Sequence, residues 1–214
     1  GLTGQTYPAF VVDTFLREGL LKHLKELEQL SKGKPLALAS YISFPRSTEV
    51  VNVLRLAICP YEPVDCDRYC PGKFKERGCD DVAGLLDREL FEQVLADGER
   101  SAIFFSRSSI VKEYYQEQQV YFFYLKLADE LARIEIPQWV AKDKKLIDLV
   151  HSVVLDQCQR GQGYPVALSE AHEKAVITAA DREQFWQLVE MALVKRDRLM
   201  KSSAKSKSKR TRWV

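Results

Sequence analysis

The chain has 214 residues, 46% hydrophobic and 29% charged, so it can bury a sizeable core and has an ordinary globular composition. No apolar run approaches the roughly 18 residues of a membrane-spanning helix, and the N-terminus lacks the basic-then-apolar pattern of a signal peptide. We therefore expect no membrane association. Five cysteines without an export signal favour a reducing, cytoplasmic compartment.

The net charge of +2 hides an uneven distribution. Residues 195–212 concentrate Lys and Arg, which leaves the rest of the chain net acidic. Residues 202–212 are a low-complexity Ser, Lys and Arg segment that cannot form a core. We expect one domain over residues 1–200, followed by a disordered basic tail over residues 201–214.

The first half of the chain alternates predicted helices with one strand and one long loop. The apolar spacing predicts helices over residues 9–30, 48–58 and 85–95. The run LALASYISF predicts a buried strand over residues 36–44. Residues 59–79, rich in Cys, Pro, Gly and Asp, are predicted to form a loop.

The second half begins with strands and ends with helices. Strands are predicted over residues 101–106, 120–128 and 131–136, and the last two are expected to pair as a hairpin around Asp129 and Glu130. Residues 111–116 read as a helix or turn, and helices are predicted over 143–159, after Pro165 and over 182–194. Strands with helices before and after them indicate an α/β or α+β domain.

The segment GQGYP, residues 161–165, is the most informative stretch of the chain. Its glycines permit a sharp turn, and Pro165 suits the first turn of a helix. His172 lies four residues after Leu168 and four before Val176, on the apolar face of that helix. It is either a core residue with a satisfied imidazole or a ligand aimed into a site.

Several motifs together resemble the NurA nucleases, in the bacterial, cyanobacterial-like branch. They are YISFPRS before a helix, DRxxF, GERS, FFY, RxExP and the block GQGYPVALSEAHEKAV, the last being the most specific. The resemblance covers most of the chain, from about residue 36 to residue 194.

This resemblance implies an RNase H-like, PIWI-like α/β fold, a mixed sheet with flanking helices. It also implies a nuclease that processes DNA ends and single-stranded DNA in double-strand break repair, with a HerA-type helicase and as a homodimer. The implied cofactor is a divalent metal, Mn²⁺ or Mg²⁺. By resemblance Asp87 and His172 are catalytic metal ligands, and Glu135 is a further expected ligand.

These residues also have structural interpretations. Asp87 opens a predicted helix and suits an N-cap as well as a metal site. Arg133 and Glu135 lie two apart on one face of a strand and are expected to form an ion pair. Alternatively Arg133, Lys126 and Arg46 contact phosphates in a nuclease groove.

Other polar and aromatic residues belong to less specific patterns. Lys205 and Lys207 of the basic tail are expected to bind nucleic acid without sequence preference. Tyr124 suits either a stacking position for a base or the core. Glu49 is a weaker metal candidate.

Four cysteines, Cys59, Cys66, Cys70 and Cys79, fall within the loop over residues 59–79. Their spacing lacks two C-x-x-C knuckles, so a structural Zn²⁺ site, a disulfide and free thiols all remain open. Cys158 is expected to be buried in a helix.

Two departures from the family pattern affect the expected activity. The Asp-Gly-Ser motif of the family's first strand does not occur, and Ser106 stands where a second acid is expected. We therefore expect either the larger C-terminal part of a nuclease, inactive as this fragment, or a catalytically incomplete module that binds nucleic acid or docks a helicase. A PIWI-like RNA-guided protein is disfavoured, because no segment resembles a guide-binding pocket.

Overall fold

The computed structural model describes residues 10, 12–72, 77–115 and 118–194. The chain divides into two compact units, Gly1–Val166 and Ala167–Val214. The basic tail, with Lys205 and Lys207, lies outside the described residues. The single-domain assignment therefore stays a prediction.

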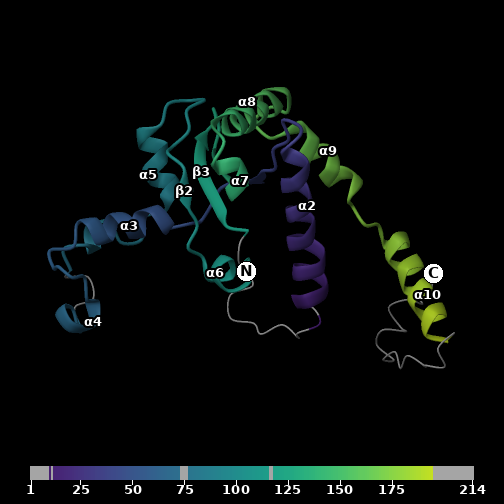
Figure 1. Ribbon diagram of the computed structural model, residues 1–214, viewed down its shortest axis with the longest axis horizontal. Helices are drawn as coiled ribbons and strands as arrows, with labels where there is room; N and C mark the ends of the chain where they lie inside the picture. Colours follow the sequence, from purple (N-terminus) through teal and green to yellow (C-terminus); the bar gives the residue numbers. More distant parts are fainter. Residues whose placement is uncertain (1–9, 11, 73–76, 116–117, 195–214) are drawn as a thin grey trace, which may run out of the picture. The chain divides into compact units, whose positions relative to one another are not determined.

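The first unit combines helices with a small sheet (Figure 1). The strands are β1 (Ser40–Ile42), β2 (Phe104–Phe105), β3 (Val120–Lys126) and β4 (Leu131–Pro137). The helices before the hairpin are η1 (Val12–Leu21), α2 (Lys22–Ser31), α3 (Glu49–Ala57), α4 (Cys66–Tyr69), η2 (Asp80–Val82), α5 (Asp87–Val94) and α6 (Ser109–Tyr114). After it come α7 (Gln138–Ala141) and α8 (Lys144–Arg160).

The four described strands form one sheet in the order β1-β4-β3-β2, with antiparallel neighbours throughout. The predicted hairpin is confirmed, with Lys126 opposite Leu131 and Val120 opposite Pro137. An α/β protein is thus confirmed. The expected mixture of parallel and antiparallel strands is not found in the described part of the sheet.

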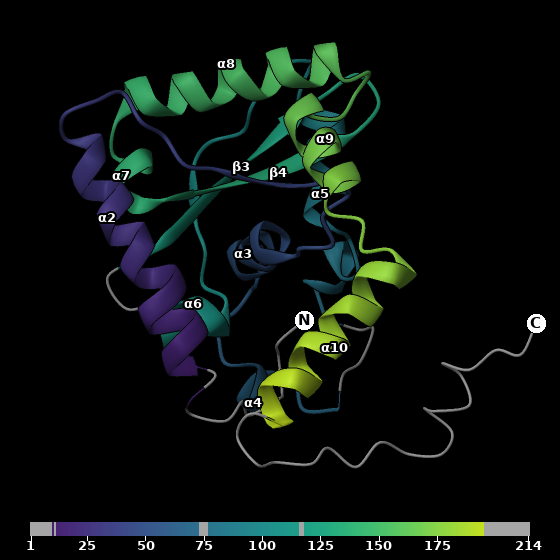
Figure 2. The same ribbon diagram turned by 90° about the vertical axis from the view of Figure 1, so that its right-hand side faces the viewer.

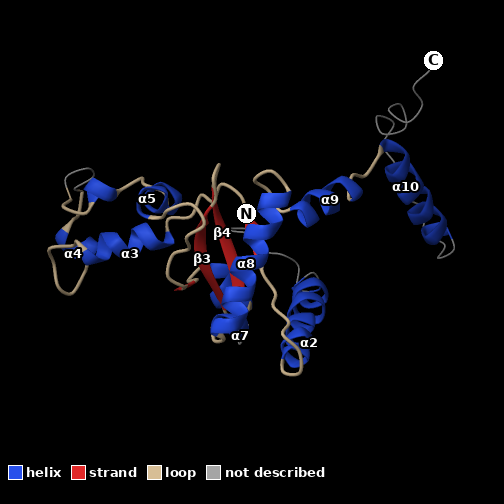
Figure 3. Ribbon diagram, turned by 90° about the horizontal axis from the view of Figure 1, so that it is seen from above, coloured by secondary structure: helices blue, strands red, loops and turns tan. Residues whose placement is uncertain are grey.

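Helices cover both faces of the β3–β4 hairpin, as the view from above shows (Figure 3). Successive side chains of a strand point to opposite faces. Phe123 and Leu125 therefore pack with residues of α7 and α8; in Figure 2, α8 runs above the hairpin and α7 lies at one end of it. Phe122 and Tyr124 pack on the other side with Phe91 of α5. Because helices cover both faces of the hairpin, the strand sequence VYFFYL is almost continuously apolar.

Two predicted strands are much shorter than expected. Only Ser40–Ile42 of residues 36–44 pairs, with Arg133 to Glu135 of β4. In residues 101–106 the side chain of Ser101 accepts the hydrogen bond of the Tyr124 backbone N–H at 2.9 Å. That side-chain bond replaces a backbone partner, so the regular ladder covers only Phe104 and Phe105, and an isolated bridge joins Arg100 to Leu125.

The first two helices leave large apolar side chains exposed. The helical prediction for residues 9–30 is confirmed over η1 and α2, but neither helix has a buried residue. Phe10, Phe15 and Leu30 are all more than half exposed. The predicted apolar stripe is thus present on these helices, but no helix or strand among the described residues buries it.

The second unit holds α9 (Val166–Lys174), except for its first residue, and α10 (Ala179–Val194). Both predicted helices are confirmed. His172 is exposed on α9, so the expectation that it points away from solvent is not met.

The GQGYP turn joins α8 to α9 through a backbone reversal that demands glycine. A Cβ on Gly161 would lie 1.9 Å from the carbonyl oxygen of Tyr164, and Gly163 has a φ of +104°. The turn is held against β1 by an edge-to-face contact between the rings of Tyr164 and Tyr41, 5.4 Å apart. Tyr41 in turn donates a short hydrogen bond to Glu130 in the hairpin loop.

Gly161→Ala should destabilise the protein by about 1–3 kcal/mol, because the added methyl group overlaps a backbone carbonyl that cannot move independently. Gly33→Ala is the matched control, since its Cβ would meet nothing within 4 Å. Urea unfolding curves of both variants give the comparison. Equal stabilities of the two variants would contradict the tight turn.

Candidate functional site

Asp87 is a fully buried carboxylate that ties the start of α5 to the start of α3. Its Oδ1 accepts a hydrogen bond from the Val51 backbone N–H at 2.8 Å, and its own N–H donates to the Ser47 carbonyl at 2.9 Å. First-turn N–H groups of a helix have no partner within the helix. Asp87 therefore caps α3, whereas the N-cap of its own helix is Leu86. The N-cap interpretation was wrong about which helix is capped.

Tyr124 is hydrogen-bonded to the other carboxylate oxygen of Asp87. Its hydroxyl donates to Oδ2 at 2.7 Å, and its side chain is fully buried in the middle of β3. Burial, strengthened by the Asp87 carboxylate, raises the pKa of Tyr124 well above its ordinary value. The core interpretation of Tyr124 is confirmed, and the residue is not accessible for stacking on a base.

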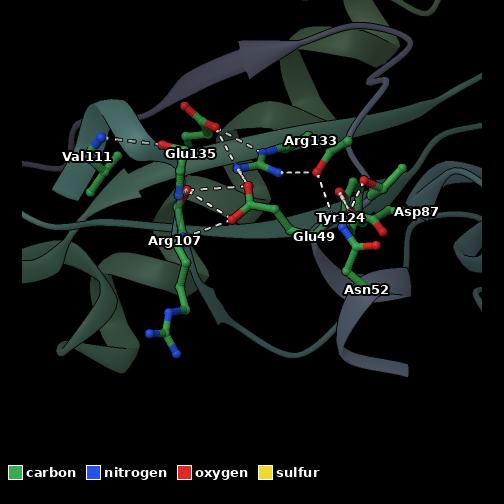
Figure 4. Close-up of polar contacts among 12 residues, drawn as sticks. Glu49, Asn52, Asp87, Arg107, Val111, Tyr124, Arg133 and Glu135 are labelled. Carbon is green, nitrogen blue, oxygen red and sulfur yellow. Dashed lines mark hydrogen bonds and ion pairs between the residues drawn. The ribbon is translucent and has the colours of Figure 1, made fainter. Parts of the chain in front are cut away.

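Arg133 lies at the centre of the polar network (Figure 4). Its Nε donates to Glu135 Oε1 at 2.9 Å and its Nη1 donates to Ser47 Oγ at 2.9 Å. Its Nη2 donates to Glu49 Oε1, also at 2.9 Å. The guanidinium lies 3.6 Å from the centroid of the Phe122 ring, and its side chain is only 6% exposed.

The two carboxylates favour the charged form of Arg133. Burial by itself lowers the pKa of the guanidinium, but Glu135 and Glu49 raise it above its ordinary value. The predicted ion pair between Arg133 and Glu135 is confirmed. Glu49 is a second anionic partner that sequence spacing did not indicate.

Glu49 connects this network to the end of β2. Its Oε2 accepts from the Arg107 backbone N–H at 2.9 Å and from the Ser106 hydroxyl at 3.2 Å. The Arg107 side chain extends away from the network in Figure 4. Ser106, noted in the sequence only as the replacement for an acid, thus orients a carboxylate that comes from α3.

A cavity of about 350 Å³ opens beside this network. Its polar lining comprises Arg46, Ser47, Glu49, Ser106, Arg133 and Glu135, with a hydroxyl each from Ser108 and Tyr115. Burial, with a smaller effect of Glu135, raises the pKa of Tyr115. The segment after β1, the end of β2 and strand β4 supply its walls.

Arg46, Arg133 and Lys126, the three cations predicted to bind phosphates, differ in how freely they can bind an anion. Arg46 is exposed and lines the cavity. Arg133 lines it too, but its donors are committed to Glu49, Glu135 and Ser47. The Nζ of Lys126 donates to the Glu92 carbonyl at 2.8 Å. Arg46 is therefore the best placed of the three for an incoming anion.

The four-cysteine loop contains free thiols. Cys59, Cys66, Cys70 and Cys79 form no disulfide, and Cys158 is buried as predicted. Arg55 of α3 approaches Cys79 Sγ at 3.9 Å and Asp80 at 3.5 Å, which fastens the end of the loop. The structural Zn²⁺ site stays a prediction.

The described residues do not fit a two-metal centre in this arrangement. Among them, no three His, Cys, Asp or Glu side chains gather closely enough to hold an ion. Both oxygens of Asp87 are engaged in buried hydrogen bonds, and Glu135 and Glu49 face a guanidinium. A cation at these carboxylates would compete with Arg133. His172 belongs to the second unit, so its sharing of a metal with Asp87 stays a prediction.

Comparison with protein families adds independent evidence. The model of the NurA domain matches residues 7–177, which include the whole polar network and the GQGYP turn. The chain belongs to the NurA family. Membership in this family indicates a nuclease-type function in DNA repair. Searches of curated proteins and of solved structures found no match.

The match places both the buried network and the helix that bears His172 within the NurA domain. The motifs YISFPRS and GQGYP are part of the resemblance to this family, and the structure shows a role for each. YISFPRS supplies Ser47 to the polar network, and GQGYP forms the turn before α9. No helix among the described residues is long and apolar enough to cross a membrane.

Asp87→Ala should unfold more easily than Asp87→Asn. The alanine variant leaves the Val51 N–H and the Tyr124 hydroxyl buried without an acceptor, which costs about 1–3 kcal/mol for each group. The asparagine variant keeps one oxygen acceptor. Asp156→Ala, which removes an exposed ion pair with Arg160, is the control and should change stability by less than about 1 kcal/mol.

Chemical denaturation gives the free energy of unfolding of all three variants. A similar, small loss for both Asp87 variants would contradict the capping role.

Stability should decrease above pH 10 because buried Tyr124 and half-buried Tyr41 donate hydrogen bonds to carboxylates. Burial and the nearby Glu130 raise the pKa of Tyr41, as burial and Asp87 do for Tyr124. Both side chains are neutral below the unfolded-state pKa of about 10, so their contribution is complete there. Above it the unfolded chain loses protons that the folded protein retains, and the free energy of unfolding falls as pH rises.

Urea unfolding across this alkaline range measures the slope. Tyr124→Phe should make the slope shallower, because one of the two groups no longer ionises. An unchanged slope would mean that Tyr124 ionises freely in the folded protein.

Proposed function

We propose that this protein acts as a metal-dependent nuclease on DNA ends and single-stranded DNA, in double-strand break repair with a HerA-type helicase. Its expected cofactor is Mn²⁺ or Mg²⁺, its location the cytoplasm and its assembly a homodimer. An RNase H-like core is the fold we propose, and the antiparallel hairpin with helices on both faces is compatible with it. The NurA-domain match over residues 7–177 is the observation that carries the proposal.

The cavity supports a DNA-binding role. Arg46 is exposed at its wall, and serine hydroxyls of Ser47, Ser106 and Ser108 line it. Arginine and hydroxyl groups are common donors to phosphate oxygens. The charge of Arg133 is already balanced by two carboxylates, so its role here is to hold Glu49 and Glu135 in place.

The same network favours a second candidate, a catalytically incomplete module that binds nucleic acid or docks a helicase. Two-metal hydrolysis needs carboxylates that are free to bind cations. Here Asp87 is fully buried and the other two acids face Arg133. We propose that residues 1–214 by themselves hold at most one weakly bound divalent ion and cleave DNA slowly.

The test is cleavage of labelled single-stranded DNA by the purified chain with Mn²⁺, with and without a HerA-type helicase. Slow cleavage by the chain alone is expected, and His172→Ala should reduce any manganese-dependent turnover at least tenfold. Asp87→Asn serves as the second variant, because it removes the charge and keeps one of the two oxygen acceptors of this buried side chain. Rapid cleavage by the chain alone that Asp87→Asn abolishes would overturn the incomplete-site candidate.

Unchanged turnover in His172→Ala would remove His172 from the site. Binding without cleavage under every condition would favour the docking module over the nuclease.

Deleting residues 201–214 should weaken single-strand binding and reduce its dependence on salt. The segment contains Lys205 and Lys207 among other basic residues, and each phosphate contact releases counterions. Fluorescence anisotropy at several salt concentrations measures the slope. If the affinity and the salt slope survive the deletion, the tail does not bind DNA.

A further inference from the structure

Phe44 is an exposed aromatic residue beside the cavity. It follows β1 and directly precedes Pro45 and Arg46, both of which line the cavity. Its side chain is 58% exposed. Residue 42, two positions earlier, also lines the cavity, so the ring belongs to the segment that forms one wall.

The backbone of Phe44 has a conformation that a bulky residue rarely adopts. Its φ is +45°, in the left-handed region that favours glycine or asparagine. Such strain is usually balanced by packing or by function. The ring is mostly exposed and so gains little from burial, which makes a functional reason for this phenylalanine the better explanation.

Two arginines belong to the surroundings of the ring, Arg88 through space and Arg46 along the chain. The guanidinium of Arg88, in the first turn of α5, lies 6.0 Å from the ring centroid, at the outer limit of a cation–π contact. Arg46 is exposed two residues along the chain. Neither arginine has an ion pair with an acid among the described residues. The segment thus combines an exposed aromatic surface with positive charge, as single-strand binding sites do.

We infer that Phe44 stacks on a base of single-stranded DNA at the mouth of the cavity, while Arg46 and Arg88 contact the adjacent phosphates. This inference rests on the proposed DNA-binding function and names the residue that would hold a base. A ring has no hydrogen-bonding preference among bases, so the contact is independent of sequence. Stacking there would place the neighbouring phosphate near the serine-lined wall.

Equilibrium binding of two labelled strands to the full chain tests the inference. One strand is oligothymidylate, and the other is an abasic strand of equal length that carries the same phosphates without bases. Phe44→Ala should weaken oligothymidylate binding about 5- to 100-fold, the range for loss of one stacked base. The same variant should leave binding of the abasic strand unchanged, and Phe44→Trp should retain affinity for oligothymidylate.

Three further variants separate stacking from other effects. Phe15→Ala removes another exposed ring, 72% exposed on η1, and should change neither affinity. Arg46→Ala should weaken both strands alike and reduce the salt slope, because it removes a phosphate contact. Phe44→Gly should lose affinity as Phe44→Ala does while its thermal midpoint stays the same or rises, since glycine tolerates the positive φ.

Each result has one meaning. Equal affinities of the wild type and Phe44→Ala for oligothymidylate would overturn the stacking role and leave the proposed function intact. Equal losses on both strands would also overturn it, and a lower thermal midpoint in Phe44→Gly would show that Phe44 acts in folding. Failure of the wild type to bind either strand would overturn the proposed DNA-binding function and the inference together.

Discussion

The buried guanidinium of Arg133 is the interaction on which the rest of the site depends. It reaches from the middle of β4 to Glu49 and Ser47 at the start of α3, and to Glu135 on its own strand. Removing a charge from water is costly unless partners replace the lost hydration. The three partners and the Phe122 ring supply that replacement, and they fix the start of α3 against the sheet.

A second constraint acts on the opposite side of the same helix start. Asp87 accepts from Val51 in α3 and from Tyr124 in β3, so a buried carboxylate and a buried guanidinium approach one helix terminus from two directions. Both are linked through Ser47, whose hydroxyl accepts from Arg133 and whose carbonyl accepts from Asp87. Ser47, the last residue of the YISFPRS motif, thus connects charges that lie far apart in the sequence. In such a network, loss of one member leaves others unpaired.

The positions of the helices and strands along the chain could largely be predicted from the sequence. The lengths of the strands and the contacts within the polar network could not. The β3–β4 hairpin followed from two apolar runs around Asp129 and Glu130, because local turn chemistry decides such a pairing. The strand over residues 36–44 was overestimated, since only three of its residues find a partner on β4. The ion pair of Arg133 with Glu135 followed from two-residue spacing, but no local pattern indicated Glu49, 84 residues away in sequence, as the other partner of Arg133.

The sequence by itself determined the family, the hairpin, the helix boundaries near Gly and Pro, and the need for glycine before α9. These features depend on backbone conformation and side-chain periodicity over a few residues. Only the tertiary structure decided that Asp87 caps another helix, that Tyr124 is buried with its hydroxyl on that acid, and that Arg133 balances two carboxylates. Burial and charge compensation depend on which segments meet in space, and no local pattern carries that information.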